Sequence, residues 1–182
     1  MSTRAVIARL VGPGRFRGNY HHWDGYPNGL GASLHELYHN HFNKDIGVML
    51  KYLIDDHPAG WSTICGRDFT QEPGYVENPE VKAHQKQSEQ PPECFCHGDR
   101  KDDGWIVTEK NASGSGCEYA YAFTKGENGH NLMVVLSSYR KDGGKMVGFF
   151  GFGDKDALWR EIGVVDLDSE TGPDWEAITK AV

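Results

Sequence analysis

The distribution of apolar residues along the chain restricts its fold to a mixture of helices and strands. Apolar side chains recur every three or four residues within residues 30–56, which is the spacing of amphipathic helices. Residues 4–22 have the pattern of a hairpin around the Gly-Pro-Gly turn at 12–14, and from Trp105 onward the chain consists mainly of short alternating or apolar runs. This pattern predicts an α+β fold, with a mainly antiparallel sheet and two consecutive helices on one face.

We expect the two helices at about residues 30–42 and 44–56, with Asn43 as the N-cap of the second helix. A short terminal helix should follow Pro173. The strands of the second half are expected in the runs GWIVTEK, CEYAYAFT, NLMVVLSSY, KMVGFFGFG and LWREIGVVDL, with a hairpin turn at residues 141–144.

The chain of 182 residues has the length of one domain, and we assign residues 1–182 to a single folding unit. Residues 67–93 interrupt this unit with a segment that is rich in Glu, Gln, Pro and Lys and has no sustained periodicity. Such a composition cannot form a packed core, so we interpret the segment as a long irregular excursion. We expect it beside the functional face, because Cys94 and Cys96 follow it directly. A surface insertion without a role is the alternative.

Composition limits the partners of the chain. Its 26 acidic and 19 basic residues give a net charge of −7, which argues against nucleic-acid binding because that requires a basic surface. No apolar leader follows Met1 and no apolar run is long enough to span a bilayer, so we expect a cytoplasmic protein without membrane contact. In that compartment the four cysteines should be reduced or bound to metal. A small molecule or a peptide remains as the expected partner.

Five of the nine histidines lie in residues 20–42, which makes this segment the first candidate for chemistry. His35, Glu36 and His39 form a His-Glu-x-x-His motif, which on a helix places two imidazoles one turn apart with a carboxylate beside them. Zinc-dependent hydrolases use this arrangement to hold the ion and to polarise its water. A third ligand could come from the aspartates at positions 55–56. The alternative is a solvated polar helix face.

A second candidate site is a run of metal-binding residue types, Cys94, Cys96 and His97, with Cys117 further along the chain. Two thiols and an imidazole on one loop, joined by a distant cysteine, can complete the tetrahedral coordination that zinc prefers. Cys65 could replace His97 as the fourth ligand. The alternative is a set of small buried thiols without a metal.

The junction between the N-terminal hairpin and the first helix is a third candidate site. Polar and aromatic residues leave the strand here and pass through glycines into the helix, whose first N–H groups attract anionic or polar ligands. The ligand-binding candidates are His21, His22, Trp23, Asp24, Tyr26 and Asn28. The alternative is a tight turn in which Asp24 caps the helix and the aromatic residues pack.

Two short motifs near the N-terminus carry a resemblance. Met-Ser-Thr-Arg at residues 1–4 and His-Trp-Asp-Gly-Tyr-Pro at residues 22–27 resemble a group of uncharacterised bacterial and phage proteins. The resemblance is specific from residue 1 to about residue 31 and implies no particular activity. It adds weight to the junction as a site, and a phage-related protein of this kind could sequester a nucleotide-like signal. The His-Glu-x-x-His motif is similar to zincins over five residues only.

These features lead to three hypotheses about function. The first is a small metal-dependent hydrolase in which His35 and His39 bind zinc and Glu36 is the catalytic base. The second is a non-catalytic module that binds a nucleotide-like or anionic small ligand at the junction, residues 21–31. The third is an N-terminal-nucleophile hydrolase, which would require loss of the initiator methionine to expose Ser2.

Overall fold

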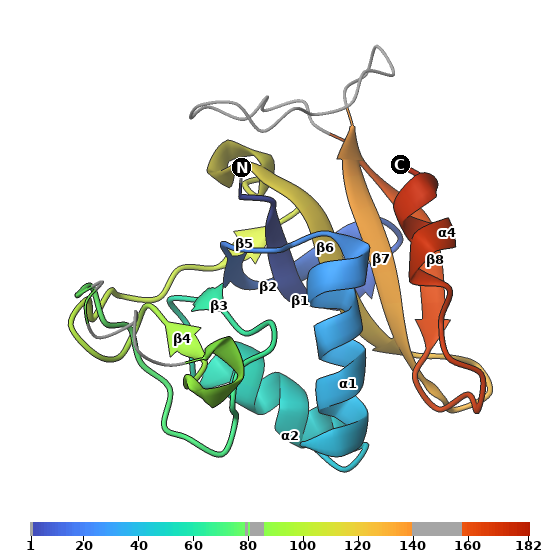
Figure 1. Cartoon of the computed structure of the whole chain (residues 1–182). Helices are drawn as coiled ribbons and strands as arrows, with labels where there is room; N and C mark the ends of the chain where they lie inside the picture. Colours follow the sequence, from blue (N-terminus) through green and yellow to red (C-terminus); the bar gives the residue numbers. More distant parts are fainter. Residues whose placement is uncertain (1, 79, 81–85, 140–157) are drawn as a thin grey trace.

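One mixed sheet runs through the molecule, with helices packed in front of it in the view of Figure 1. The computed structural model describes residues 2–78, 80, 86–139 and 158–182. The sheet has eight strands in the order β4-β3-β2-β1-β6-β7-β8, and β5 also pairs with β2. The strands are β1 (Arg4–Gly12), β2 (Arg15–His21), β3 (Trp61–Thr63), β4 (Glu93–Cys94), β5 (Val107–Thr108), β6 (Cys117–Lys125), β7 (Asn131–Tyr139) and β8 (Leu158–Asp166).

Most neighbouring strands are antiparallel, and the predicted α+β class is confirmed. β1 and β2 form the predicted N-terminal hairpin, and β6, β7 and β8 follow one another as antiparallel neighbours. β1 pairs with β6 in parallel, as β2 does with β3, so the sheet is mixed. The long connections between these pairs include helices, and a connection of that length can bring the chain back in the same direction.

Two of the expected strands differ from the prediction in extent or lie beyond what is described. In the run GWIVTEK only Val107–Thr108 forms a strand, and the preceding Trp105 and Ile106 are exposed. The expected strand KMVGFFGFG and the hairpin turn at residues 141–144 lie outside the described residues.

Both predicted helices are present, and each includes a π-helical part. Helix α1, Ala32–Asn40, begins directly after a π-helical turn at Pro27–Gly31. Helix α2, Ile46–Leu50, continues as a π-helical segment at Lys51–Asp55. Hydrophobic spacing alone does not separate these hydrogen-bond patterns, so the prediction found the helices and missed their irregular ends.

The prediction that Asn43 caps the second helix is wrong. Asn43 has φ +49° in the connection between the helices, and Asp45 is the N-cap of α2, its Oδ1 accepting the N–H of Val48 at 3.0 Å. The expected terminal helix is present as α4, Trp175–Lys180, with Asp174 as its N-cap. In the described part of the chain, no helix combines the length and the apolar composition needed to cross a membrane.

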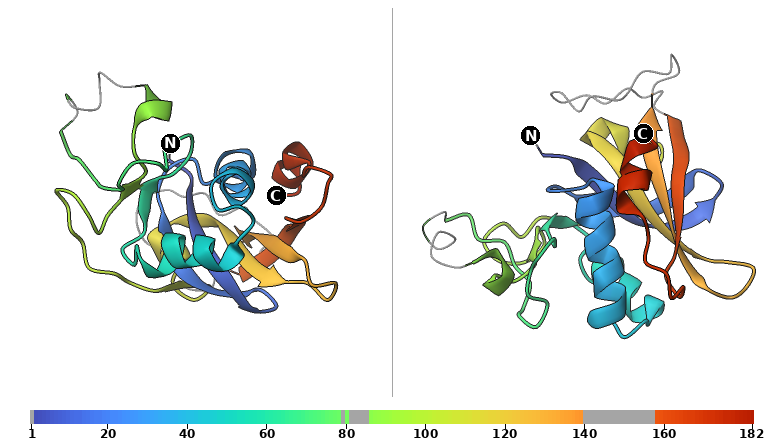
Figure 2. Two further views of the ribbon diagram at one scale, coloured as in Figure 1. Left: turned by 90° about the horizontal axis from the view of Figure 1, so that it is seen from below. Right: turned by 45° about the vertical axis from the view of Figure 1, so that its right-hand side comes forward.

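The sheet separates two apolar clusters. The larger cluster lies between the sheet and the helices, and Figure 2 shows α1, α2 and α4 on the same side of the sheet. Along β1, Ala5 and Ile7 belong to this cluster, whereas Val6 and Ala8 belong to the smaller cluster on the other face. The same alternation places Asn19 of β2 on the helix-covered face, beneath the end of the second helix.

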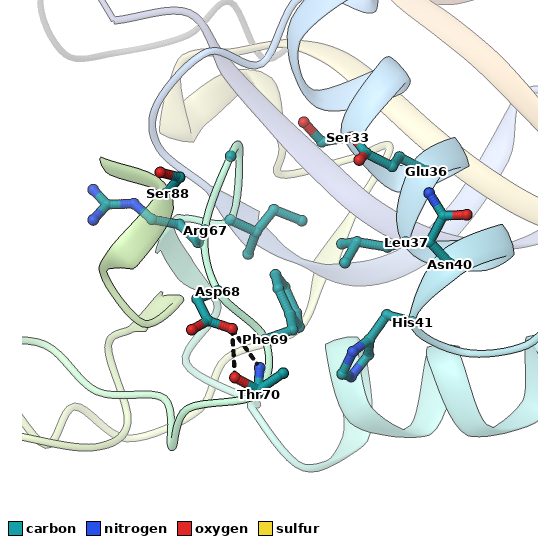
Figure 3. Close-up of a pocket in the computed structure, with 12 residues that line it drawn as sticks. Ser33, Glu36, Leu37, Asn40, His41, Arg67, Asp68, Phe69, Thr70 and Ser88 are labelled. Atoms are coloured by element: carbon teal, nitrogen blue, oxygen red, sulfur yellow. Dashed lines mark hydrogen bonds between the residues drawn. The ribbon is translucent and has the colours of Figure 1, made fainter. Parts of the chain in front are cut away.

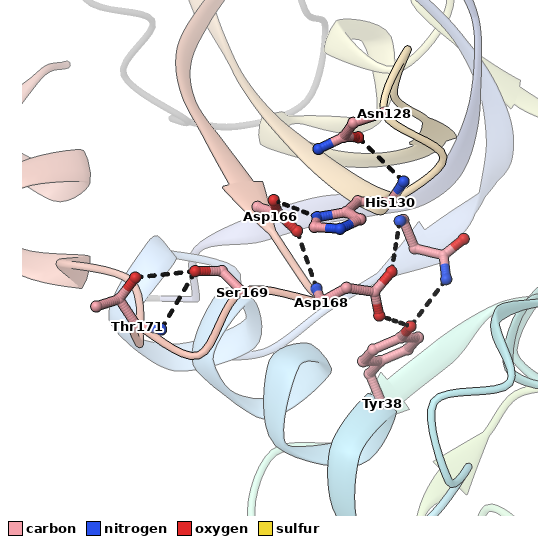
Figure 4. Close-up of polar contacts among 8 residues, drawn as sticks. Tyr38, Asn128, His130, Asp166, Asp168, Ser169 and Thr171 are labelled. Carbon is pink, nitrogen blue, oxygen red and sulfur yellow. Dashed lines mark hydrogen bonds and ion pairs between the residues drawn. The ribbon is translucent and has the colours of Figure 1, made fainter.

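A polar network ties the end of α1 to the sheet (Figure 4). The buried hydroxyl of Tyr38 donates to Oδ1 of Asp168 at 2.6 Å and accepts from Nδ2 of Asn131 at 2.8 Å. Burial and the hydrogen bond to Asp168 raise the pKa of Tyr38 to about 12. Nearby, the hydrogen bond between Nδ1 of His130 and Oδ2 of Asp166, 2.8 Å long, raises the pKa of His130 and lowers that of Asp166.

We expect Tyr38→Phe to lower the free energy of unfolding by about 1–2 kcal/mol, because it leaves two polar partners in the network without their hydroxyl. Urea denaturation measures this loss. Thr171→Ala is the matched control, since it removes an exposed hydrogen bond to Ser169 shown in the same figure and should change stability by less than about 0.5 kcal/mol. A loss in Tyr38→Phe no larger than the control's would contradict a stabilising network.

Candidate metal centre

Four side chains from two segments of the chain converge beside β3 and β4. Their possible ligand atoms, one each from His57, Cys94, Cys96 and His97, all lie within 4.8 Å of one another. Sγ of Cys94 is 3.2 Å from Nδ1 of His97, and Sγ of Cys96 is 3.6 Å from Nδ1 of His57. Two thiols and two imidazoles at this separation could hold a metal ion. We call these four residues the metal group.

His57 is fixed by the backbone that surrounds it. It lies between the π-helical end of the second helix and β3, and Nδ2 of buried Asn19 donates to its carbonyl oxygen at 2.8 Å. The same amide donates to the carbonyl oxygen of Leu53 at 2.9 Å. Gly60 follows with φ +81°, and a Cβ there would lie 2.3 Å from the carbonyl oxygen of Tyr20. The turn from residue 57 to residue 60 is therefore held tightly against β2.

The other three residues of the metal group lie at the end of β4, where Cys94 is the last residue of the strand and Cys96 and His97 lie on the turn that follows. Cys94 pairs with Trp61 of β3, and the N–H of Phe95 donates to the carbonyl oxygen of Gly60 at 3.0 Å. Gly98 closes the turn with φ +78°, and a Cβ at this position would lie 2.2 Å from the carbonyl oxygen of Tyr75. A left-handed residue in such close contact must be glycine, so the sequence Cys-Phe-Cys-His-Gly suits this turn.

The surroundings of the metal group change the protonation of its buried members. His57 packs against Trp61 and Tyr52, with ring centroids 4.4 Å and 4.9 Å apart. Burial, and then the neighbouring His97, lower the pKa of His57 to about 4, so its imidazole is neutral near pH 7 and can offer a lone pair. Burial, and then the adjacent Cys96, raise the pKa of Cys94. A bound cation would reverse this cost by stabilising the thiolate.

The metal group differs from the predicted ligand set at one position. Cys94, Cys96 and His97 are members, but Cys117 is not: it is buried in β6, and its Sγ donates to the carbonyl oxygen of Ala5 at 3.6 Å. His57 completes the group instead. The sequence pattern does not single out His57, which follows the two candidate aspartates at positions 55–56 and whose only local signal is its place in a turn between a helix and a strand.

The His-Glu-x-x-His motif lies on α1, as expected. The rings of His35 and His39 have centroids 4.5 Å apart, and His35 lies 6.2 Å from the ring of Trp175. Glu36 lines a groove between α1 and residues 66–70. Within the described ranges, no third histidine, cysteine or acidic residue joins this pair in a group that could hold a metal ion.

The structure divides the predicted ligand-binding residues of the junction. His21 is fully buried and its Nε2 accepts the N–H of Ile64 at 3.3 Å, so its side chain lies in the core. Nδ1 of His22 lies 2.6 Å from the hydroxyl of Tyr20, and Trp23 packs edge-on against His22. The remaining three line an open pocket: Asp24, Tyr26 and Asn28.

This pocket continues into a groove along α1, part of which is shown in Figure 3. Two adjoining cavities of about 530 and 440 Å³ share Ser33, Glu36, Gly66 and Ser88. In Figure 3 the side chains of α1 face residues 67–70 across the groove. The groove is thus formed by a helix on one side and by the chain that leaves β3 on the other.

The two ends of the excursion of residues 67–93 are joined to each other by polar contacts. Arg67 forms a buried ion pair with Glu93, N to O 3.3 Å, and the N–H of Asp68 donates to the carbonyl oxygen of Gln90 at 2.9 Å. The base therefore lies between the groove and the metal group.

Comparison with protein-family models, with curated proteins and with solved structures found no match to this chain.

Gly98→Ala should lower the free energy of unfolding by about 1–3 kcal/mol, because the new methyl group meets a backbone oxygen and the residue must keep a left-handed conformation. Urea denaturation provides the measurement. Gly114→Ala is the control, since a Cβ at Gly114 has no neighbour within 4 Å and should leave stability within about 0.5 kcal/mol. Equal stabilities for the two variants would show that the turn does not depend on glycine.

Proposed function

We propose that the protein binds one zinc ion at the metal group and that this ion is structural, holding the wall of a ligand-binding groove. The proposal rests on one observation: four side chains of the residue types that bind zinc, from two separate segments, lie within 4.8 Å. Four protein ligands leave no open position for water or substrate, which is the property of structural rather than catalytic zinc sites.

The chemistry of the metal group suits a divalent cation of this kind. Two thiolates would balance the charge of the ion, and the neutral imidazole of His57 needs no proton removed before it binds. The rings of Trp61 and Tyr52 exclude water on one side of His57. Cys94 is fully buried, whereas His97 is exposed. An ion could therefore enter from the side of His97.

The position of the metal group explains what a structural ion would stabilise. β3 has three residues and β4 has two, so their ladder contributes few hydrogen bonds. An ion bound to His57 before β3 and to Cys94 in β4 would cross-link both strands and close the long loop between them. The chain leaving β3 forms the outer wall of the groove, so the ion would determine the shape of that groove.

The hydrolase hypothesis has less support from the geometry. It needs a third ligand near His35 and His39, and within the described residues none joins them. The groove supports the hypothesis of a non-catalytic module instead, because Asp24, Tyr26 and Asn28 line one end of it. These three residues come from the junction at which a polar ligand was expected.

Elemental analysis of purified protein should find about one zinc per chain, and the ion should be lost in His57→Ala and in Cys96→Ser because each removes a ligand. Circular dichroism checks that each variant remains folded. His35→Ala and Cys117→Ser are the matched controls, and both should retain the ion. Zinc that is lost in His35→Ala but kept in Cys96→Ser would transfer the site to the His-Glu-x-x-His motif.

Removal of the ion by a chelator should loosen the chain on both sides of it. We expect amide hydrogen exchange to accelerate by at least about tenfold in residues 61–70 and 93–98, whose backbone order depends on the cross-link. Exchange in β6 and β7 serves as the internal control and should not change. Uniform exchange before and after chelation would show that the ion, if bound, does not hold the groove wall.

A further inference from the structure

A separate cavity of about 700 Å³ lies where the β1–β2 hairpin extends beyond the second helix. Its floor is the helix-covered face of the two strands, and its walls are the end of the π-helical segment and residues 104–106. Three of its apolar side chains are half exposed: Val11 (53%), Trp105 (45%) and Ile106 (50%). Exposed apolar side chains that gather in one hollow, rather than singly, indicate a binding site.

Two arginines face this cavity, and only one of them pairs with a carboxylate among the described residues. Arg9 and Arg17 are direct partners in the antiparallel register of β1 and β2 and lie on the same face. Like charges directly opposite each other destabilise a strand pair. Arg9 is neutralised by Asp55, whose two carboxylate oxygens accept from its guanidinium at 2.9 and 2.8 Å.

Arg17 has no such compensation. Among the residues that the structure describes, no carboxylate pairs with it, and its side chain is exposed at the cavity. The neighbouring Arg15 has its own acidic partner, Glu109, at 3.7 Å. In a chain of net charge −7, the cavity therefore presents one uncompensated guanidinium. Trp105, whose ring centroid lies 6.4 Å from that of Tyr20, lines the same cavity.

We propose that this cavity binds a small planar aromatic anion, with its acidic group on Arg17 and its ring against Trp105 and Ile106. A guanidinium offers a planar fork of N–H donors to a carboxylate or phosphate, and an exposed indole offers a flat apolar surface to an aromatic ring. The site is distinct from the proposed zinc centre and from the α1 groove. It goes beyond the function proposed above, since no residue of the metal group lines it.

Isothermal titration calorimetry with four defined probes tests the ligand class. 2-Naphthoate combines an aromatic ring with a carboxylate, and adenosine monophosphate combines an aromatic ring with a phosphate. The neutral 2-naphthamide lacks the charge, and inorganic phosphate lacks the ring. We expect a Kd of about 1 mM or tighter for at least one aromatic anion, and binding at least about tenfold weaker for the amide and for phosphate. The preferred aromatic anion identifies the acidic group.

Variants test the two contacts separately. Arg17→Gln and Trp105→Ala should each weaken binding of the preferred aromatic anion by at least about tenfold. Arg17→Gln should also leave the melting temperature of the ligand-free protein unchanged or higher, because it relieves the repulsion with Arg9. If Arg17 merely supported the fold, the substitution would lower the melting temperature. Lys180→Gln on α4 is the control for the loss of one positive charge and should bind as the unsubstituted protein does.

Three results would overturn the proposal: no binding of either aromatic anion, equal binding of the neutral amide, or unchanged binding in Arg17→Gln. None of these results bears on the zinc content of the protein, because neither Arg17 nor Trp105 belongs to the metal group. A failure of the zinc proposal would likewise leave the calorimetric test intact, since β1 and β2 are held by the sheet rather than by the metal group.

Discussion

The buried amide of Asn19 connects β2 to the end of the second helix and to the turn before β3. Its Nδ2 donates to the carbonyl oxygens of Leu53 and His57, the former in the last turn of the second helix and the latter in the turn to β3. A helix end leaves carbonyl groups without partners, and a buried one needs a donor from elsewhere. One side chain thereby fixes where the helix ends, where β3 begins and how a potential metal ligand is presented. Asn19 also lines the cavity between the β1–β2 hairpin and residues 104–106.

At the β3–β4 edge of the sheet, polar contacts add to the apolar packing of Trp61 and Ile64. β4 has only two residues, and the base of the excursion is joined by the ion pair of Arg67 with Glu93. Buried charges of this kind require good geometry to offset their desolvation, and they specify one arrangement of the chain. The proposed cross-linking ion in the metal group would add to these constraints on the least regular part of the chain, which forms one wall of the groove.

Much of the fold followed from local patterns, whereas the sites depended on contacts between distant residues. The amphipathic spacing of residues 30–56 predicted both helices, and alternation predicted most strands, because these signals act over a few residues. Cys94, Cys96 and His97 were recognisable as neighbours in sequence. His57 was not, since only the pairing of β3 with β4 brings it beside them. The opposition of Arg9 and Arg17 also required the strand register, which a sequence pattern does not specify on its own.

The parallel pairing of β1 with β6 has a consequence for how the chain acquires its structure during synthesis. Arg4 pairs with Cys117, so the central strand of the sheet gains its second neighbour only after more than half of the chain has been made. Until then one edge of β1 exposes unpaired N–H and C=O groups, and such an edge can pair with another chain. Contacts of this sequence separation also slow folding, since a long loop must close before they form. The protein would therefore be most prone to aggregation before β6 has been synthesised.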